Sequence, residues 1–132
     1  MLGSVDFKEV TVIADLEAGI GTLTRLGDQR VDAVLVVVEP TPKSIEVGTR
    51  AAELAREKSL GKVVVVASRV RDEADLATVQ AAFPGYDIVP VPDDAAIVRA
   101  ERQGVAPMDS APDAPAVRAL VDLAENLLPV SA

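Results

Sequence analysis

The order of elements in this chain is decided by residues 33–67, AVLVVVEPTPKSIEVGTRAAELAREKSLGKVVVVA. The stretch opens and closes with short apolar runs, Ala33–Val38 and Lys62–Ala67, whose β-branched valines are typical of strands buried on both faces. Between them, Thr41 and Pro42 indicate a helix start, because threonine caps free amide groups and proline suits the first helical turn. The stretch therefore predicts a β-α-β unit with parallel strands and a right-handed crossover.

The helix inside this unit is expected to run to about Ser59 and to be closed by Gly61. One of its faces carries small and apolar residues at helical spacing, which predicts close packing against the two strands. These residues are Ile45, Gly48, Ala52 and Ala55.

Alternating elements continue after the unit. A helix is predicted over Glu73–Phe83, followed by a strand over Asp87–Val91, where Pro90 favours an edge position because it cannot donate to a neighbouring strand. A polar loop is expected between Ser68 and Asp72. A further helix begins at Asp93 or Asp94 and ends at Gly104.

The two ends of the sequence complete the pattern. Val10–Ala14 is predicted as a strand, with a loop and a short helix over Gly19–Gly27. Ala106–Ala114 is expected to be a loop, and Asp113 is expected to cap the last helix. The apolar stripe predicted for that helix consists of Val117, Leu120, Val121, Ala124 and Leu128.

These elements predict one α/β domain over residues 1–132. Its sheet is expected to have about four parallel strands with helices on both faces, in three layers. In such sheets ligands bind beyond the carboxyl ends of the strands.

Charge and residue types narrow the choice of ligands. A formal net charge of −8 repels the phosphates of nucleic acids and anionic membranes, so neither is an expected partner. Cysteine and histidine are absent, which leaves carboxylates and carbonyls as metal ligands and favours hard ions such as Mg²⁺. The first residues show no basic segment leading into a long apolar one, so a cytoplasmic location is expected.

Polar residues follow the predicted strands, and Asp15 with Gly19 is the sharpest pattern among them. A carboxylate after a buried strand suits a Mg²⁺ ion, and a glycine four residues later lets a phosphate approach the backbone. The same residues also suit a plain strand end and turn. Glu39 could face a ligand or mark a helix start, and Ser68 could contact a nucleotide base or lie in a solvated loop.

Taken in order, three motifs resemble those of MinD/ParA-like P-loop ATPases. DLEAGI at residues 15–20 follows the first strand, EPTPKSIE at residues 39–46 follows the second, and Pro92-Asp93-Asp94 precedes the helix that contains Ile97. The first two are most similar to the nickel-insertion accessory ATPases of carbon monoxide dehydrogenase. The resemblance covers residues 10–128 and corresponds to the C-terminal half of the family, which implies a single truncated P-loop NTPase-like domain.

The resemblance implies ATP with Mg²⁺ as the cofactor. Asp15 would be the switch carboxylate near the metal, and Gly19 would sense the γ-phosphate. Pro92 and Asp94 would flank the adenine. Three departures oppose activity: no G-x-x-x-x-G-K-[ST] phosphate loop occurs, Ser68 stands where the family has asparagine, and the paired metal-binding cysteines are missing.

We therefore expect at most residual nucleotide binding by the chain itself, and action through a protein partner or a homodimer. Without the strand that carries the phosphate loop, Val10–Ala14 would lack its neighbour, and a second chain could supply one. One alternative is half of a split or truncated ATP-hydrolysing accessory protein. Another is a receiver-like or flavodoxin-like interaction domain, although the lysine expected after the last strand of a receiver is missing.

Overall fold

The computed structural model describes residues 11–15 and 31–127, and the strands of this part form a parallel sheet. Its members are β1 (Ala33–Val38), β2 (Lys62–Val70) and β3 (Asp87–Pro92), in the spatial order β1-β2-β3. Two helices connect them, α2 (Pro42–Glu57) and α3 (Glu73–Ala82). The predicted β-α-β unit and the edge position of the strand with Pro90 are thus confirmed within the described sheet.

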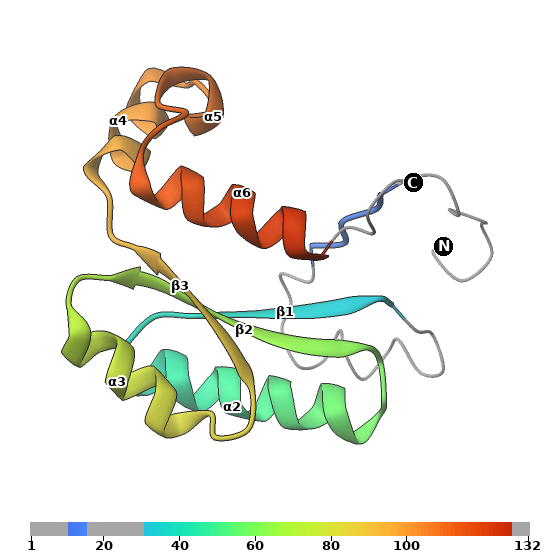
Figure 1. Ribbon diagram of the computed structural model, residues 1–132. Coiled ribbons are helices and arrows are strands. Elements are labelled where there is room, and N and C mark those ends of the chain that lie inside the picture. The colour runs from blue at the N-terminus through green and yellow to red at the C-terminus, as the bar shows by residue number, and fades with distance from the viewer. Residues whose placement is uncertain (1–10, 16–30, 128–132) are drawn as a thin grey trace.

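Helices cover both faces of the sheet, which confirms the predicted α/β architecture (Figure 1). The connecting helices α2 and α3 lie on one face, and α6 (Pro115–Leu127) lies on the other. The segment between β3 and α6 folds into α4 (Ala95–Gln103) and α5 (Pro107–Ser110), which lie together beyond one end of the sheet. This arrangement leaves the loops after β1 and β3 at the same edge.

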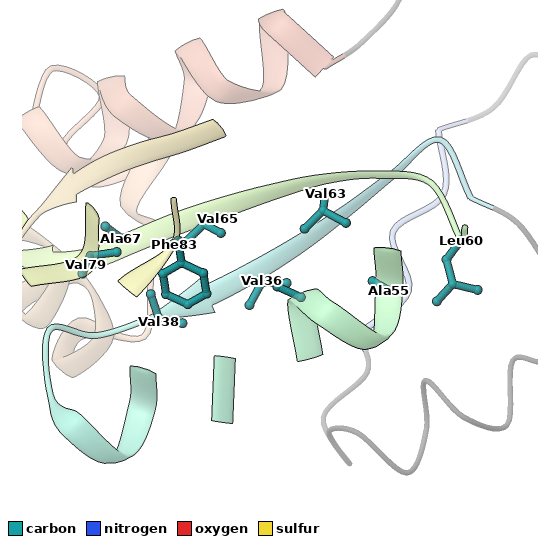
Figure 2. Close-up of a cluster of buried hydrophobic side chains, with 10 residues drawn as sticks. Val36, Val38, Ala55, Leu60, Val63, Val65, Ala67, Val79 and Phe83 are labelled. Carbon is teal, nitrogen blue, oxygen red and sulfur yellow. The ribbon is translucent and has the colours of Figure 1, made fainter. Parts of the chain in front are cut away.

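The larger core lies between the sheet and the two connecting helices (Figure 2). Phe83, at the end of α3, is 1% exposed and packs among the valines of β1 and β2. Val79 of α3 is fully buried in the same cluster. The predicted inward face of α2 is confirmed, because Gly48, Ala52 and Ala55 are its buried residues.

Gly48 brings α2 unusually close to β1. A β-carbon built on Gly48 would lie 2.2 Å from Cγ1 of Val38 and 3.4 Å from Cζ of Phe83. Because Val38 is itself only 1% exposed, it has no free space into which to retreat. A glycine is therefore required here by packing.

The second core shows that the predicted stripe of α6 was only partly right. Leu120 is 46% exposed, and Ala124 is also exposed, whereas Ala116 and Leu123 are buried against Val64 of β2 and its neighbours. Val117 is buried as predicted, and Leu128 lies outside the described residues. Apolar residues occupy more than half of the circumference of this helix, so hydrophobicity alone does not select the face that meets the sheet.

Other features also differ from prediction, and the described sheet has three strands where about four were predicted. Residues 11–15 belong to no strand and are exposed. A segment becomes a strand only when its backbone has a partner. Val10 and the predicted helix over residues 19–27 lie outside the described part. The third predicted strand continues as β2 to Val70, and residues 107–110 form the single turn α5. The last helix begins at Pro115, so Asp113 is not its N-cap.

Candidate functional site

Three strand ends meet at one edge of the sheet and place four of the predicted site residues there. Glu39 follows β1, Ser68 lies in the last part of β2, and Pro92 ends β3 just before Asp94. Because all three strands are parallel, their carboxyl ends face the same side, the side where α/β sheets bind ligands.

The guanidinium of Arg69 links these strand ends. Its Nη1 lies 3.2 Å from Oε1 of Glu39, and its Nε lies 3.5 Å from Oδ1 of Asp93. One cation on the central strand therefore contacts a carboxylate from each neighbouring strand end. The side chain of Arg69 remains 67% exposed, so both ion pairs are accessible to solvent and screened by salt.

The backbone of Arg69 is strained. Its φ angle is +59°, in the left-handed region that costs a non-glycine residue roughly 1–2 kcal/mol. The strand register between β2 and β3 shifts between Ala67 and Val70, so Arg69 occupies an irregularity in the pairing. Such positions are adopted readily by glycine.

The loop after β1 is held by its own side chains. Thr41 is the N-cap of α2, as predicted, and its Oγ1 accepts a hydrogen bond from the amide of Ser44 at 3.4 Å. The amide of Glu39 in turn donates to Oγ of Ser44 at 2.8 Å. These two bonds fix where the chain leaves β1, and with it the start of the Glu39 side chain.

Asp94 has a structural role at this edge. Its Oδ1 accepts from the amide of Ala96 in α4 at 2.9 Å, and its Oδ2 accepts from the amide of Ala116 in α6 at 3.1 Å. These two bonds, the one from Ala116 first, lower the pKa of Asp94 below its ordinary value of 3.8. One carboxylate thus caps two helices, and it replaces Asp113 as the acceptor at the start of α6.

The remaining predicted site residues are placed less closely together. Ser68 and Pro92 are half-buried in the sheet, and the amide of Asp93 donates to the carbonyl of Val70 at 2.9 Å. Asp15 is exposed, and Gly19 lies outside the described residues. Within residues 11–15 and 31–127, no three acidic side chains gather closely enough to hold a metal ion.

The sequence indicated the segments that contain Arg69 and Asp93, at the ends of two strands, but did not single out either residue as part of the site. Arg69 stands in a charged stretch, SRVRD at residues 68–72, which is as typical of a solvated loop as of a binding edge. The register shift that turns Arg69 toward both neighbours depends on β3, which begins after a whole helix has intervened. No local signal in the sequence could have paired Arg69 with Glu39, thirty residues earlier.

A groove of about 380 Å³ lies at the opposite end of the sheet, under the last turns of α6. Its rim includes Lys62 and Asp87, which form an exposed ion pair of 3.5 Å, and its floor includes Val64 and Leu123. This groove is at the amino ends of β2 and β3, away from the edge where this class of sheet binds ligands.

The fold and the polar edge together define a small parallel α/β domain with a candidate ligand edge. Comparison with known proteins adds similarity to an ATP-binding protein and to an accessory protein of carbon monoxide dehydrogenase. The chain is 36% identical over 66 residues to an uncharacterized ATP-binding protein of Methanocaldococcus jannaschii, a match that covers 50% of this chain and 26% of that protein. It is 26% identical over 106 residues to the carbon monoxide dehydrogenase accessory protein CooC of Rhodospirillum rubrum, covering 80% of this chain and 40% of CooC.

Both similarities extend over only part of the chain. The chain matches less than half of the length of either relative. No family model matches it. Among the described residues, no helix has both the length and the apolar character needed to cross a membrane.

Proposed function

We propose that this chain is a MinD/ParA-like ATPase-family domain related to the carbon monoxide dehydrogenase maturation ATPases, with at most residual nucleotide binding of its own and action through a protein partner. The observation that carries the proposal is the similarity to CooC over 80% of the chain. The parallel sheet, with Glu39, Ser68 and Pro92 at its carboxyl edge, supports it, because nucleotides bind at this edge in doubly wound sheets.

The chemistry of the chain limits what it does alone. Phosphoryl transfer relies on backbone amides and cations placed around the phosphates, and the sequence contains no G-x-x-x-x-G-K-[ST] loop. Mg²⁺ is commonly held by one or two carboxylates together with the phosphates of the substrate. Asp15 could supply one such carboxylate, but the described residues assemble no metal site around it, so we derive no catalytic step.

Titration calorimetry with Mg-ATP tests the proposed residual binding. We expect a dissociation constant of about 1 mM or weaker, which corresponds to a binding free energy of about 4 kcal/mol or less. The variant Asp15→Ala should weaken this binding further. Asp32→Ala is the matched control, because Asp32 is an exposed aspartate just before β1, at the amino end of the sheet.

Phosphate release tests the absence of hydrolysis. The isolated chain should release phosphate from ATP or GTP only at the background rate. Steady release by the wild-type chain that disappears in Asp15→Ala, while Asp32→Ala remains as active as wild type, would show that the chain hydrolyses nucleotide by itself and would refute this part of the proposal.

One observation favours the second candidate, half of a split ATP-hydrolysing protein. Leu35 and Val37 of β1 are 43% and 63% exposed. Since side chains alternate along a strand, they lie on the face opposite Val36 and Val38, where α6 packs on β2 and β3. A right-handed connection that extended the sheet beyond β1 would place its helix over this face.

Light scattering at micromolar concentration tests the partner or homodimer. If a second copy covers Leu35 and Val37, the wild-type mass will exceed that of a monomer, and Val37→Lys will reduce it while the circular dichroism spectrum remains that of the folded protein. Val12→Lys tests whether a second copy covers the exposed segment Thr11–Asp15. A wild-type monomer whose mass neither substitution changes would exclude the homodimer and leave only a different partner chain.

A further inference from the structure

Arg69 occupies a backbone position that would be less strained with glycine. At φ +59°, within the register shift of β2 against β3, a β-carbon is unfavourable. Residues held in such conformations often belong to ligand sites, where the surrounding structure compensates for the strain. The presence of a long cationic side chain here is therefore explained by what the side chain contacts.

Those contacts are exchangeable. The two carboxylates that meet the guanidinium, Glu39 and Asp93, have side chains 46% and 43% exposed. Exposed ion pairs contribute little, about 0–1 kcal/mol each. A phosphate group offers the same guanidinium several charged acceptor oxygens in a geometry that suits its two-pronged donors.

We propose that Arg69 is the anion-binding residue of this edge, held in the ligand-free protein between Glu39 and Asp93 and transferred to a phosphate group of the ligand on binding. The identification of a nucleotide as the source of that phosphate rests on the proposed function. The anion site itself rests on the backbone and the contacts of Arg69.

The charges around the edge predict whether each substitution weakens or strengthens anion binding. Glu39, Asp93 and Asp94 place three carboxylates on the loops around Arg69, and the chain as a whole carries a net charge of −8. Arg71 and Arg99 also act electrostatically on Asp93 and Asp94, but Arg69 is the arginine that contacts the carboxylates of both neighbouring strand ends. A phosphate approaching this edge is repelled by the carboxylates and attracted by the guanidinium of Arg69. Removing Arg69 should therefore weaken anion binding, whereas neutralising a carboxylate that competes for Arg69 should strengthen it.

Three variants distinguish the effect of the Arg69 side chain on binding from an effect on folding. Arg69→Gly removes the cation and also relieves the backbone strain, so it should fold at least as well as wild type. Glu39→Gln removes the charge of one carboxylate that pairs with the guanidinium of Arg69. Glu46→Gln is the control, because Glu46 forms a similar exposed pair of 3.3 Å with Arg50 on α2.

Binding is measured by calorimetry and by amide chemical shifts, at constant ionic strength, with inorganic pyrophosphate, Mg-ATP and adenosine as probes. We expect Arg69→Gly to weaken pyrophosphate binding by about tenfold or more, the usual effect of losing a charge-assisted hydrogen bond. Glu39→Gln should strengthen it several-fold, and Glu46→Gln should leave it unchanged. Adenosine, which has no phosphate, should respond to none of these substitutions.

The outcomes distinguish this inference from the proposed function. Absence of pyrophosphate binding by wild type, or equal binding by wild type and Arg69→Gly, overturns the inference. Mg-ATP binding that is equal in wild type and Arg69→Gly also overturns it while leaving the nucleotide site in place. Pyrophosphate binding that depends on Arg69, with no binding of Mg-ATP, supports the anion site and shows that a nucleotide is not the source of its phosphate.

Discussion

The contact between α2 and β1 at Gly48 predicts that a single added methyl group destabilises the protein. In Gly48→Ala the new β-carbon would lie 2.2 Å from Cγ1 of Val38, so the helix and the strand must separate by more than about 1 Å to reach an ordinary contact. Overpacking of a buried site of this kind usually costs about 1–3 kcal/mol.

An opposing effect has to be subtracted from that cost. Alanine is about 1 kcal/mol more favourable than glycine inside a helix. Because Val38 is fully buried and Phe83 closes the other side of the site at 3.4 Å, we expect the upper part of the packing cost to apply. The net result should be a loss of about 1–2 kcal/mol in the free energy of unfolding.

Urea denaturation followed by circular dichroism measures this loss. The midpoint should fall by about 1 M with an unchanged slope. The double variant Val38→Ala/Gly48→Ala removes the clashing methyl group, so it should be more stable than the sum of the two single effects predicts, by about 1–2 kcal/mol. A Gly48→Ala variant as stable as wild type, or strict additivity in the double variant, would refute the close packing described for α2.

Two further perturbations test other contacts of the fold. Asp94→Ala should lower the melting temperature by about 5–10 °C, because two helices lose an N-terminal acceptor. The pKa of Asp94 is lowered in the folded protein, so its stabilising effect is complete above about pH 4 and is lost as pH falls through the folded-state pKa. Wild type should therefore lose more stability between pH 5 and pH 3 than Asp94→Asn does. Parallel pH profiles of the two proteins would contradict this role. The guanidinium of Arg56 lies 3.5 Å from the ring centroid of Tyr86 and 2.8 Å from the carbonyl of Gly85. Arg56→Ala should therefore lower the free energy of unfolding, measured with heat or urea, by about 1 kcal/mol, and Arg56→Lys should lower it less. An Arg56→Ala variant as stable as wild type would exclude the contact in solution.

Much of the site could be located from sequence, but its connections could not. Glu39 and Ser68 were predicted at strand ends because apolar runs stop there, which is a local signal. The bridge from Arg69 to Glu39 and Asp93 joins three segments separated by whole helices. Its geometry follows from the register shift between β2 and β3, and strand register is a property of the pair of strands.

Asp94 gives the same lesson for helix capping. The sequence indicated that Asp93 or Asp94 opens a helix, since an aspartate before an apolar segment is a local capping signal. It did not indicate that the second oxygen of Asp94 would also accept the amide of Ala116, twenty-two residues later. Asp113, which stands next to that helix in the sequence, was preferred for this role because only proximity along the chain was available.

Local patterns were enough to predict the β-α-β order, the parallel class of sheet and the inward face of α2, because valine runs and small residues at helical spacing carry that information. Contacts between distant segments determine which face of α6 is buried, whether residues 11–15 form a strand, and which residues Arg69 contacts. Leu120 and Leu123 are equally apolar, and only contact with Val64 and its neighbours buries the second of them. Thr11–Ala14 has the composition of a strand, but a strand also requires a neighbour for its backbone hydrogen bonds, and sequence composition cannot supply one.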